Sequence, residues 1–312
     1  MNKKILVSGC SGFVGSNLLS YLHLKFDLFG LYRENKKAPY LKGTYLWKDL
    51  SVKDLQGINS IVHLAGKAHD VKKNLDAEEY LEINTNLTKL FFDIFLQSTA
   101  SVFIYVSSVK AVADTVDGIL TENHIPNPKT PYGQSKHLAE EYILNSVIPK
   151  DKRVFILRPC MIHGPGNKGN LNLLYKFVKQ GIPYPLAAFN NKRSFLSISN
   201  LNFIIEKLIN DPDVPGGIYN IADDDALSTN QIIKIIAQAG SFKIRLWKLN
   251  PSIIKLVAST GDVLHLPLNT ERLKKLTENY VVSNEKIKKA LGIKDLPMSS
   301  TNGLINTIQS FN

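Results

Sequence analysis

Three glycines follow a short apolar run near the start of the chain and constrain the fold more than any other feature. Residues 5–15 read ILVSGCSGFVG, with glycines at Gly9, Gly12 and Gly15. Residues 5–7 are typical of a buried strand, and apolar residues recur at helical spacing after the glycines. Glycine lacks a side chain and adopts backbone angles closed to other residues, so this loop can bring a helix N-terminus against the diphosphate of a ligand. We therefore predict a strand, a nucleotide-binding loop and a helix in succession.

The composition is that of a globular chain. Its 312 residues are 44% hydrophobic, which is enough to bury the core of one large domain or of two joined ones. No apolar run reaches the roughly eighteen residues of a membrane span, and the N-terminal segment is too polar for a secretory signal. Cys10 and Cys160 have no spacing typical of zinc or disulfides. We expect a cytoplasmic protein without membrane insertion.

The formal net charge of +11 suits nucleic acid, an anionic membrane or a phosphorylated small molecule, so its sign alone does not choose among them. The lysines are spread along the chain and are interrupted by acidic residues near the C-terminus, as on solvated helices. We therefore expect no nucleic-acid partner. The histidines have no partners at ligand spacing, and no metal site is predicted.

Strands alternate with helices through the first half of the chain. Helices are predicted over residues 77–97 and 132–145, the second beginning after Pro131. Five further strands are predicted within residues 27–33, 43–49, 59–64, 101–108 and 153–159. This alternation is typical of an α/β fold, a doubly wound parallel sheet with helices on both faces. Ligands of such sheets bind beyond the carboxyl ends of the strands.

The pattern changes after about residue 160. Short elements there are separated by loops such as HGPGNKGN and DPDVPGG, which we interpret as a substrate-binding lobe. The predicted domains are therefore residues 1–160, which bind a dinucleotide, and residues 161–312, mainly a smaller lobe with some segments returning to the first domain.

Three polar residues form a candidate catalytic group. The fifth strand ends at Ser108, and Tyr132 and Lys136 lie four residues apart on one helix, so their side chains share a face. A phenol is a poor base at neutral pH, and a neighbouring cation favours its ionised form. Tyr132 could then exchange a proton with a hydroxyl or carbonyl group whose oxygen Ser108 also binds. Alone, a tyrosine and lysine at this spacing are usually a surface pair. The glycine loop and the strand that ends at Ser108 make a catalytic role the better interpretation here.

Five motifs occur together in one order: GCSGFVG at 9–15, HLAG at 63–66, SS at 107–108, YGQSK at 132–136 and RPCMIHGPG at 158–166. Together they resemble the extended short-chain dehydrogenase/reductase family, the NAD-dependent epimerases and dehydratases that act on nucleotide sugars. The resemblance implies a Rossmann-type sheet with a smaller C-terminal substrate-binding lobe. Segments 168–174, 193–201 and 283–292 further resemble a bacterial branch that handles UDP-linked N-acetylated, often 6-deoxygenated, hexosamines.

The resemblance also implies roles for residues. Ser108, Tyr132 and Lys136 match the catalytic residues, with Tyr132 as acid or base and Lys136 on the nicotinamide ribose. Cofactor contacts are implied for Gly9, Ser11, Gly12, Phe13, Val14, Gly15, Arg33, Asp49, Leu50, Leu64, Ala65, Gly66, Asn84, Tyr132, Lys136 and Pro159. Substrate contacts are implied for Ser108, Asn170, Arg193 and Arg272, where an amide can bind polar groups and a guanidinium can bind phosphate oxygens.

Two departures from the family pattern bear on cofactor and reaction. The second strand ends at Arg33 instead of the acidic residue that binds the ribose of NAD, and Lys36 and Lys37 follow. We therefore favour NADP over NAD. Val112 and Ala113 stand where many sugar epimerases of the family carry a tyrosine and a glycine, which weakens the case for a UDP-glucose 4-epimerase.

The function predicted from these residues is reduction of C4 of a UDP-4-keto-(6-deoxy)-N-acetylhexosamine for surface polysaccharide synthesis. The alternative is a 4-epimerase of UDP-N-acetylhexosamines or UDP-hexoses, which would use the same residues twice. A more remote alternative is a non-catalytic sensor that binds NADP. The resemblance also implies a homodimer through the helices that follow the fourth and fifth strands.

Overall fold

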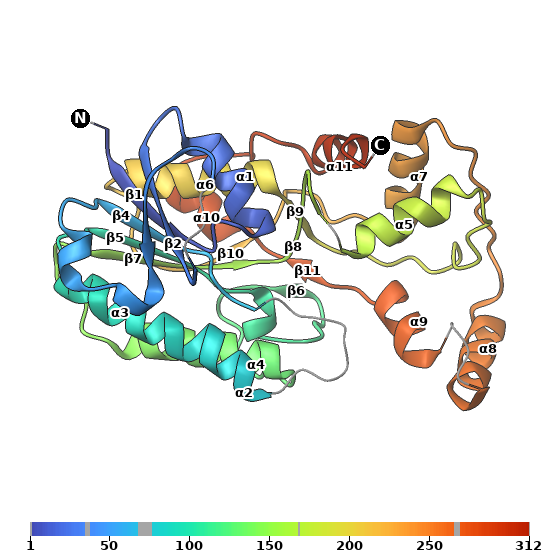
Figure 1. Ribbon diagram of the computed structural model, residues 1–312. Coiled ribbons are helices and arrows are strands. Elements are labelled where there is room, and N and C mark those ends of the chain that lie inside the picture. The colour runs from blue at the N-terminus through green and yellow to red at the C-terminus, as the bar shows by residue number, and fades with distance from the viewer. Residues whose placement is uncertain (1, 35–37, 68–76, 168, 265–268, 312) are drawn as a thin grey trace.

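A seven-stranded parallel sheet organises the molecule (Figure 1). The computed structural model describes residues 2–34, 38–67, 77–167, 169–264 and 269–311. The strand order is β3-β2-β1-β4-β5-β7-β10, and every pair is parallel. The order reverses between β1 and β4, which creates the crevice at which doubly wound sheets bind their ligands. The predicted Rossmann-type α/β fold is therefore confirmed.

The bounds of the elements agree closely with the predicted segments in the first half. The sheet strands are β1 (Lys4–Ser8), β2 (Asp27–Tyr32), β3 (Leu41–Leu46), β4 (Ser60–His63), β5 (Val102–Val106), β7 (Arg153–Pro159) and β10 (Gly217–Ile221). The longer helices are α1 (Phe13–Leu22), α3 (Leu87–Gln97), α4 (Pro131–Asn145), α5 (Asn170–Lys179), α6 (Ile198–Asn210), α7 (Thr229–Gly240), α8 (Pro251–Leu264) and α11 (Ser300–Gln309). Shorter helices are α2 (Ala77–Tyr80), α9 (Thr270–Thr277) and α10 (Glu285–Ala290).

Successive side chains of each strand point to opposite faces of the sheet, so a hydrophobic core forms on each face. In β1, Ile5 and Val7 pack with α1 and α6, whereas Leu6 packs on the other face with α3 and α4. Figure 1 shows α1, α6 and α10 on one side of the sheet and α3 and α4 on the other. The α3 face is rich in phenylalanine, and burying each such ring contributes about 1.5–3 kcal/mol. Both faces are covered, so the strands are apolar throughout.

Two features depart from the segments predicted from sequence. The single helix expected over 77–97 is interrupted by a π-helical turn, Leu81–Asn86, between α2 and α3. The seventh strand, β10, was not among the predicted strands; it pairs with β7 at the edge of the sheet. It comes from the second half of the chain, after α6 has packed beside α1.

The rest of the second half forms a separate hydrophobic core, in which α5, α7, α8 and α11 pack together. Two short parallel pairs lie outside the main sheet. β6 (Ile119–Leu120) pairs with β11 (Val281–Val282) and links the halves, whereas β8 (Met161–His163) pairs with β9 (Phe195–Ser197) within the second half. The division of the chain at residue 160 remains a prediction. Along the described residues, no helix combines the length and apolar character needed to cross a membrane.

Candidate active site

The glycine loop brings backbone atoms closer together than side chains would allow. Gly9 has φ of 73°, and a Cβ atom added there would lie 2.8 Å from the backbone nitrogen of Ala65. A Cβ on Gly15 would lie 2.2 Å from the carbonyl oxygen of Gly9. Gly12 is the N-cap of α1 and has no side chain to cap the first turn. The N–H groups of that turn can therefore bind an anion, and the loop fits the diphosphate of a dinucleotide.

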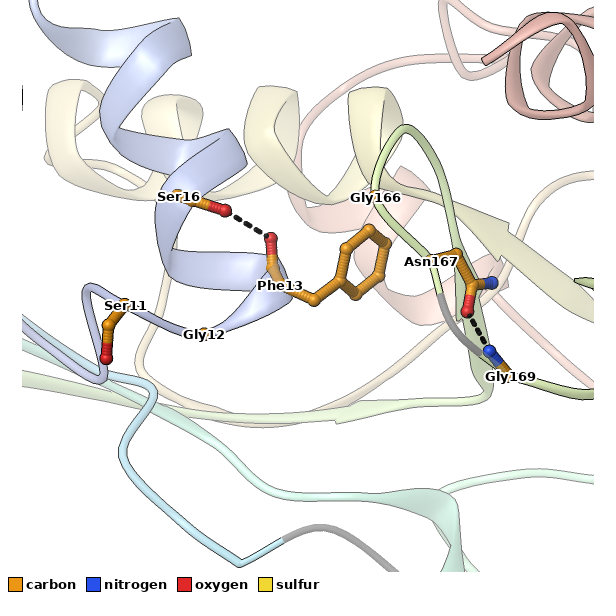
Figure 2. Close-up of a pocket in the computed structure, with 7 residues that line it drawn as sticks. All are labelled: Ser11, Gly12, Phe13, Ser16, Gly166, Asn167 and Gly169. Atoms are coloured by element: carbon orange, nitrogen blue, oxygen red, sulfur yellow. Dashed lines mark hydrogen bonds between the residues drawn. The ribbon is translucent and has the colours of Figure 1, made fainter. Parts of the chain in front are cut away.

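A cavity of about 420 Å³ lies at this loop and is lined by Ser11, Gly12, Phe13, Ser16, Gly166, Asn167 and Gly169. Figure 2 shows the ring of Phe13 pointing toward the turn that carries Gly166 and Asn167. The side chain of Asn17, in α1, donates to the carbonyl of Pro165 over 3.1 Å. The second half of the chain therefore closes one side of the predicted dinucleotide site, a contribution that the glycine motif alone does not indicate.

Asn84 and Lys136 meet at the turn after β4. A Cβ on Gly66 would lie 2.9 Å from Oδ1 of Asn84 and 3.1 Å from Nζ of Lys136. Asn84 is fully buried in the π-helical turn; its Oδ1 accepts from the backbone N–H of Lys67, and its Nδ2 donates to the hydroxyl of Ser135. Both candidate cofactor residues therefore lie against Gly66, in a space that only glycine leaves open. Turns of the π type often mark functional sites.

A buried chain of hydrogen bonds ties β1 to this turn. The Ser8 hydroxyl accepts from the N–H of Ala65 and lies 2.7 Å from Nδ1 of His63, whose Nε2 lies 2.9 Å from the hydroxyl of Thr88. Thr88 donates in turn to the carbonyl of Asn84. Thr88 must then accept from Nε2–H, which leaves Nδ1 to accept from Ser8. Burial lowers the pKa of His63 to about 3, with a smaller contribution from the charge of Lys136, so the ring is neutral.

Tyr132 and Ser108 are in contact at the carboxyl edge of the sheet. Tyr132 is half-buried near the start of α4, which is capped by Thr130, and the ring of Tyr80 packs edge-on at a centroid distance of 6.0 Å. Burial raises the pKa of Tyr132, and a hydrogen bond with Ser108 partly opposes that rise. The sequence argument expected a net decrease caused by Lys136. Burial dominates instead, so the phenol is protonated at neutral pH.

Lys136 is almost completely buried, one helical turn after Tyr132. Its Nζ donates to the carbonyl of Val106 over 3.2 Å and lies 4.9 Å from the ring centroid of Tyr105. Burial lowers the pKa of Lys136 to about 8, and the charge of Glu140 opposes the decrease. The lysine is therefore held at the end of β5 and carries its charge at neutral pH.

A buried ion pair lies next to these residues and was not among the predicted site residues. Arg158, near the end of β7, binds both carboxylate oxygens of Glu140 through its Nε at 3.0 Å. The hydroxyl of Ser107 donates to the same carboxylate. One signal was present in the sequence, because Tyr132, Lys136 and Glu140 recur every four residues on one helix face.

The residues expected at the adenosine end lie at the ends of β2 and β3. Arg33 is exposed immediately after β2, while Tyr32 before it is buried. Asp49 is exposed in a 3-10 turn after β3, and Leu50 follows it half-buried. Lys36 and Lys37, which also favoured NADP, lie outside the described residues. Arg33 is therefore an exposed cation directly after β2, and its contact with the cofactor stays a prediction.

The three candidate substrate residues of the second half lie on separate segments. Asn170 is exposed at the first position of α5, next to the cavity residue Gly169. Arg193 is half-buried, and its charge acts on Cys160 and on Tyr280, which bonds the loop after Ser108 through the carbonyl of Ala113. Arg272 is exposed in the first turn of α9. Arg193 is therefore linked to the carboxyl edge of the sheet.

Comparison with known proteins supports the same interpretation. The model of the NAD dependent epimerase/dehydratase family matches residues 5–222. A UDP-glucose 4-epimerase of Vibrio cholerae is 32% identical over 254 residues, 77% of this chain and 76% of that protein. A GDP-6-deoxy-D-mannose reductase of Pseudomonas aeruginosa is 25% identical over 261 residues, 79% of this chain and 83% of that protein.

The fold likewise has solved counterparts. The structure of MoeE5 in complex with UDP-glucose and NAD superposes with a TM-score of 0.75 at 20% identity and covers 98% of each chain. At that identity the likeness concerns the fold. The resemblance inferred from the five sequence motifs is confirmed, and the relatives include both an epimerase and a reductase.

Proposed function

The chain belongs to the NAD-dependent epimerase/dehydratase family, and we propose that it is an NAD(P)-dependent nucleotide-sugar oxidoreductase. The proposed reaction is reduction of the C4 carbonyl of a UDP-4-keto-(6-deoxy)-N-acetylhexosamine for surface polysaccharide synthesis. One observation carries the proposal: Tyr132 contacts Ser108, and Lys136 lies one helical turn away against Gly66, at the same edge of the sheet as the glycine loop.

The nicotinamide dinucleotide, when bound, supplies the hydride for C4. Tyr132 donates its phenolic proton to the carbonyl oxygen as C4 is reduced, so that the ketone becomes an alcohol. Ser108 donates a hydrogen bond to the same oxygen as negative charge develops there. The ammonium of Lys136 stabilises the phenolate that Tyr132 becomes.

The protonation states of the two catalytic side chains favour the reductive direction. Burial raises the pKa of Tyr132, so the tyrosine begins the reaction as an acid. Lys136 has a pKa of about 8, so its charge is present below that value and is lost as the pH rises through it. Turnover should therefore decrease above about pH 8.

The proposed cofactor is NADP. Separate groups of residues would bind its diphosphate, its adenosine and its nicotinamide ribose. The diphosphate would bind the N–H groups after Gly12, and the adenosine 2′-phosphate would bind Arg33, with Asp49 near the adenine. Lys136 and Asn84, which meet at Gly66, would hold the nicotinamide ribose. Ser11, Phe13, Val14, Gly15, Leu50, Leu64, Ala65 and Pro159 are proposed as further contacts.

The proposed substrate is UDP-linked, with its nucleotide bound by the second half of the chain. Asn170 would bind polar groups of the UDP portion, and Arg193 and Arg272 would bind phosphate oxygens. The sugar would then extend toward Ser108 and Tyr132.

The reaction can be tested with two substrates. A UDP-4-keto-6-deoxy-N-acetylhexosamine should oxidise NADPH in a one-to-one ratio, with the C4 alcohol identified by NMR. Conversion of UDP-N-acetylglucosamine to its C4 epimer, with no net consumption of cofactor, would instead support the 4-epimerase, an alternative that the UDP-glucose 4-epimerase relative favours. Cofactor binding without either reaction would contradict both and leave the non-catalytic sensor.

We also propose that the chain forms a homodimer through α3 and α4. Leu90 on α3 and Leu138 and Leu144 on α4 are exposed apolar side chains, and the two helices pack together on one face of the sheet. A second copy would cover them.

A further inference from the structure

Three buried residues behind the catalytic face join three elements at one carboxylate. Ser107 follows β5, Glu140 lies on α4 and Arg158 lies in β7, and their exposed fractions are 4%, 0% and 2%. Ser107 donates to Oε1 of Glu140, and Nε of Arg158 lies 3.0 Å from both carboxylate oxygens. A carboxylate buried to this degree is stable only when paired and hydrogen-bonded, and both conditions are met here.

The network sets how the end of β5 lies against α4. The carbonyl of Val106 accepts from Nζ of Lys136, and the next residue, Ser107, donates to Glu140. The residue after that, the catalytic serine, bonds the catalytic tyrosine. Three consecutive residues of the strand end therefore each bond a side chain of one helix face, and Ser107 is the middle bond.

The network also has an electrostatic consequence. Glu140 lies one helical turn beyond Lys136 on the same face of α4. Burial lowers the pKa of Lys136, and the carboxylate of Glu140 opposes that decrease. Removing the carboxylate would remove the effect that opposes desolvation, so the pKa of Lys136 should decrease further.

We infer that Ser107, Glu140 and Arg158 are positioning residues for the proposed hydride transfer, on which this inference rests. They fix the catalytic serine opposite the catalytic tyrosine and place a buried negative charge beside Lys136. Arg158 holds the carboxylate in place through two oxygens, which a single hydroxyl from Ser107 cannot do.

The charge is tested by Glu140→Gln, which keeps the size of the side chain and removes its charge. The matched control is Glu141→Gln, because Glu141 is the next residue of α4 and its side chain is 51% exposed. In Glu140→Gln, the alkaline limb of the kcat–pH profile should move at least about one pH unit lower, while the control keeps the wild-type profile. An unmoved limb in a folded Glu140→Gln protein would overturn the electrostatic role.

A double variant separates this role from stability alone. Glu140→Gln/Arg158→Gln removes both charges of the ion pair and leaves no unpaired guanidinium in the core, so its melting temperature should exceed that of Glu140→Gln while the alkaline limb stays below that of the wild type. If the double variant recovers both the melting temperature and the wild-type profile, the network is merely structural. Should Glu140→Gln fail to fold, the double variant provides the same comparison.

The positioning role is tested by Ser107→Ala, which leaves both charges in place. The expected result is a several-fold lower kcat with an unchanged alkaline limb and unchanged NADPH affinity. A wild-type kcat in this variant would overturn the positioning role.

A measurement without substrate distinguishes this inference from the proposed function. The NMR signal of the Lys136 Cε, assigned by its loss in Lys136→Arg, can be titrated in the protein alone. A lower titration midpoint in Glu140→Gln, combined with no turnover by the wild type, would reject the proposed reaction and keep the charge effect. An unchanged midpoint, combined with wild-type turnover, would reject the charge effect and keep the reaction.

Discussion

At the scale of single residues, the structure assigns charge states that the sequence pattern left open. Tyr132 and Lys136 were expected to interact through charge, with a lowered pKa for the tyrosine. Burial instead raises the pKa of Tyr132 and lowers that of Lys136. Both shifts arise because burial removes the charged form of each group from water. The spacing of residues on a helix does not indicate how deeply they are buried.

His63 provides a prediction about stability. Its pKa of about 3 in the folded protein lies below the unfolded value, so the unfolded state binds more protons between pH 3 and 6.5. The stability that depends on a neutral His63 is therefore present above about pH 6.5 and is lost as the pH falls toward 3. Between pH 7 and pH 5 the free energy of unfolding should decrease by about 2 kcal/mol from this group alone.

Urea unfolding of His63→Asn at both pH values measures that contribution. The variant should lose about 2 kcal/mol less than the wild type over this interval. His124→Asn, which changes an exposed histidine, should follow the wild type. Equal pH dependence in all three proteins would mean that folding does not lower the pKa of His63.

Arg33 provides a prediction about cofactor choice. Hydrogen bonds to a charged group contribute about 1.5–3 kcal/mol, so Arg33→Ala should weaken NADPH binding about ten- to hundredfold. NADH has no 2′-phosphate and should bind nearly as before. Isothermal titration measures both, with Lys42→Ala, an exposed residue of β3, as the control. An equal loss for the two cofactors would count against a 2′-phosphate site at Arg33.

At the scale of elements, the first half was predictable because local patterns and tertiary structure agree there. The strand, glycine loop and helix over residues 4–22, and α4 with its proline start, lie where the pattern placed them. β10 was missed because its five residues directly follow a proline- and glycine-rich segment that is typical of a loop. The π-helical turn was missed because one extra residue per turn does not alter the apolar pattern enough to be seen.

The residues of the candidate site were predictable where they lie in motifs, and were not predictable where they depend on contacts between elements. Ser108, Tyr132, Lys136 and Asn84 are found from motifs, and the structure brings them to one edge of the sheet. Glu140 and Arg158 pair across α4 and β7, and a pairing between elements has no local signal. The closure of the cavity by Gly166 and Asn167 depends on the path of the second half of the chain for the same reason.

Gly15 gives a prediction for the strand–loop–helix element. Its absent Cβ would lie 2.2 Å from the carbonyl oxygen of Gly9 and 2.8 Å from the Cα of Cys10, both backbone atoms. Gly15→Ala must therefore push α1 away from the loop, and such overpacking costs about 1–3 kcal/mol. NADPH affinity should also decrease, because the N–H groups of the first turn move.

Urea unfolding and isothermal titration test both effects. Ser20→Ala, which changes an exposed position of the same helix, should leave stability and affinity near wild type. Wild-type affinity in Gly15→Ala would show that the close contact between loop and helix is not needed for the cofactor.

At the scale of the whole molecule, the two halves of the chain share one site. The N-terminus of α1 faces the turn of Gly166 and Asn167 (Figure 2), and α6 and β10 return to the sheet from the second half. The helix α4, which carries Tyr132 and Lys136, and its neighbour α3 lie on the opposite face, where exposed leucines leave an apolar surface.

A change in oligomeric state can test whether that apolar surface is the interface of the proposed dimer. Leu90, 52% exposed on α3, should be buried in the dimer, so Leu90→Glu should shift the mass measured by light scattering from two chains to one. Leu24→Glu, at an 83% exposed position beyond α1, should leave the mass unchanged. A wild-type protein that elutes as a single chain would contradict the proposed assembly.

The most direct test of the account is a single-turnover measurement on Tyr132→Phe. With the keto-sugar and NADPH bound, NADPH oxidation should be at least about a hundredfold slower than in the wild type, because the proton donor is missing. NADPH should bind with nearly wild-type affinity, since the aromatic ring remains. Oxidation at the wild-type rate would show that Tyr132 is not the acid and would contradict the assignment of this site.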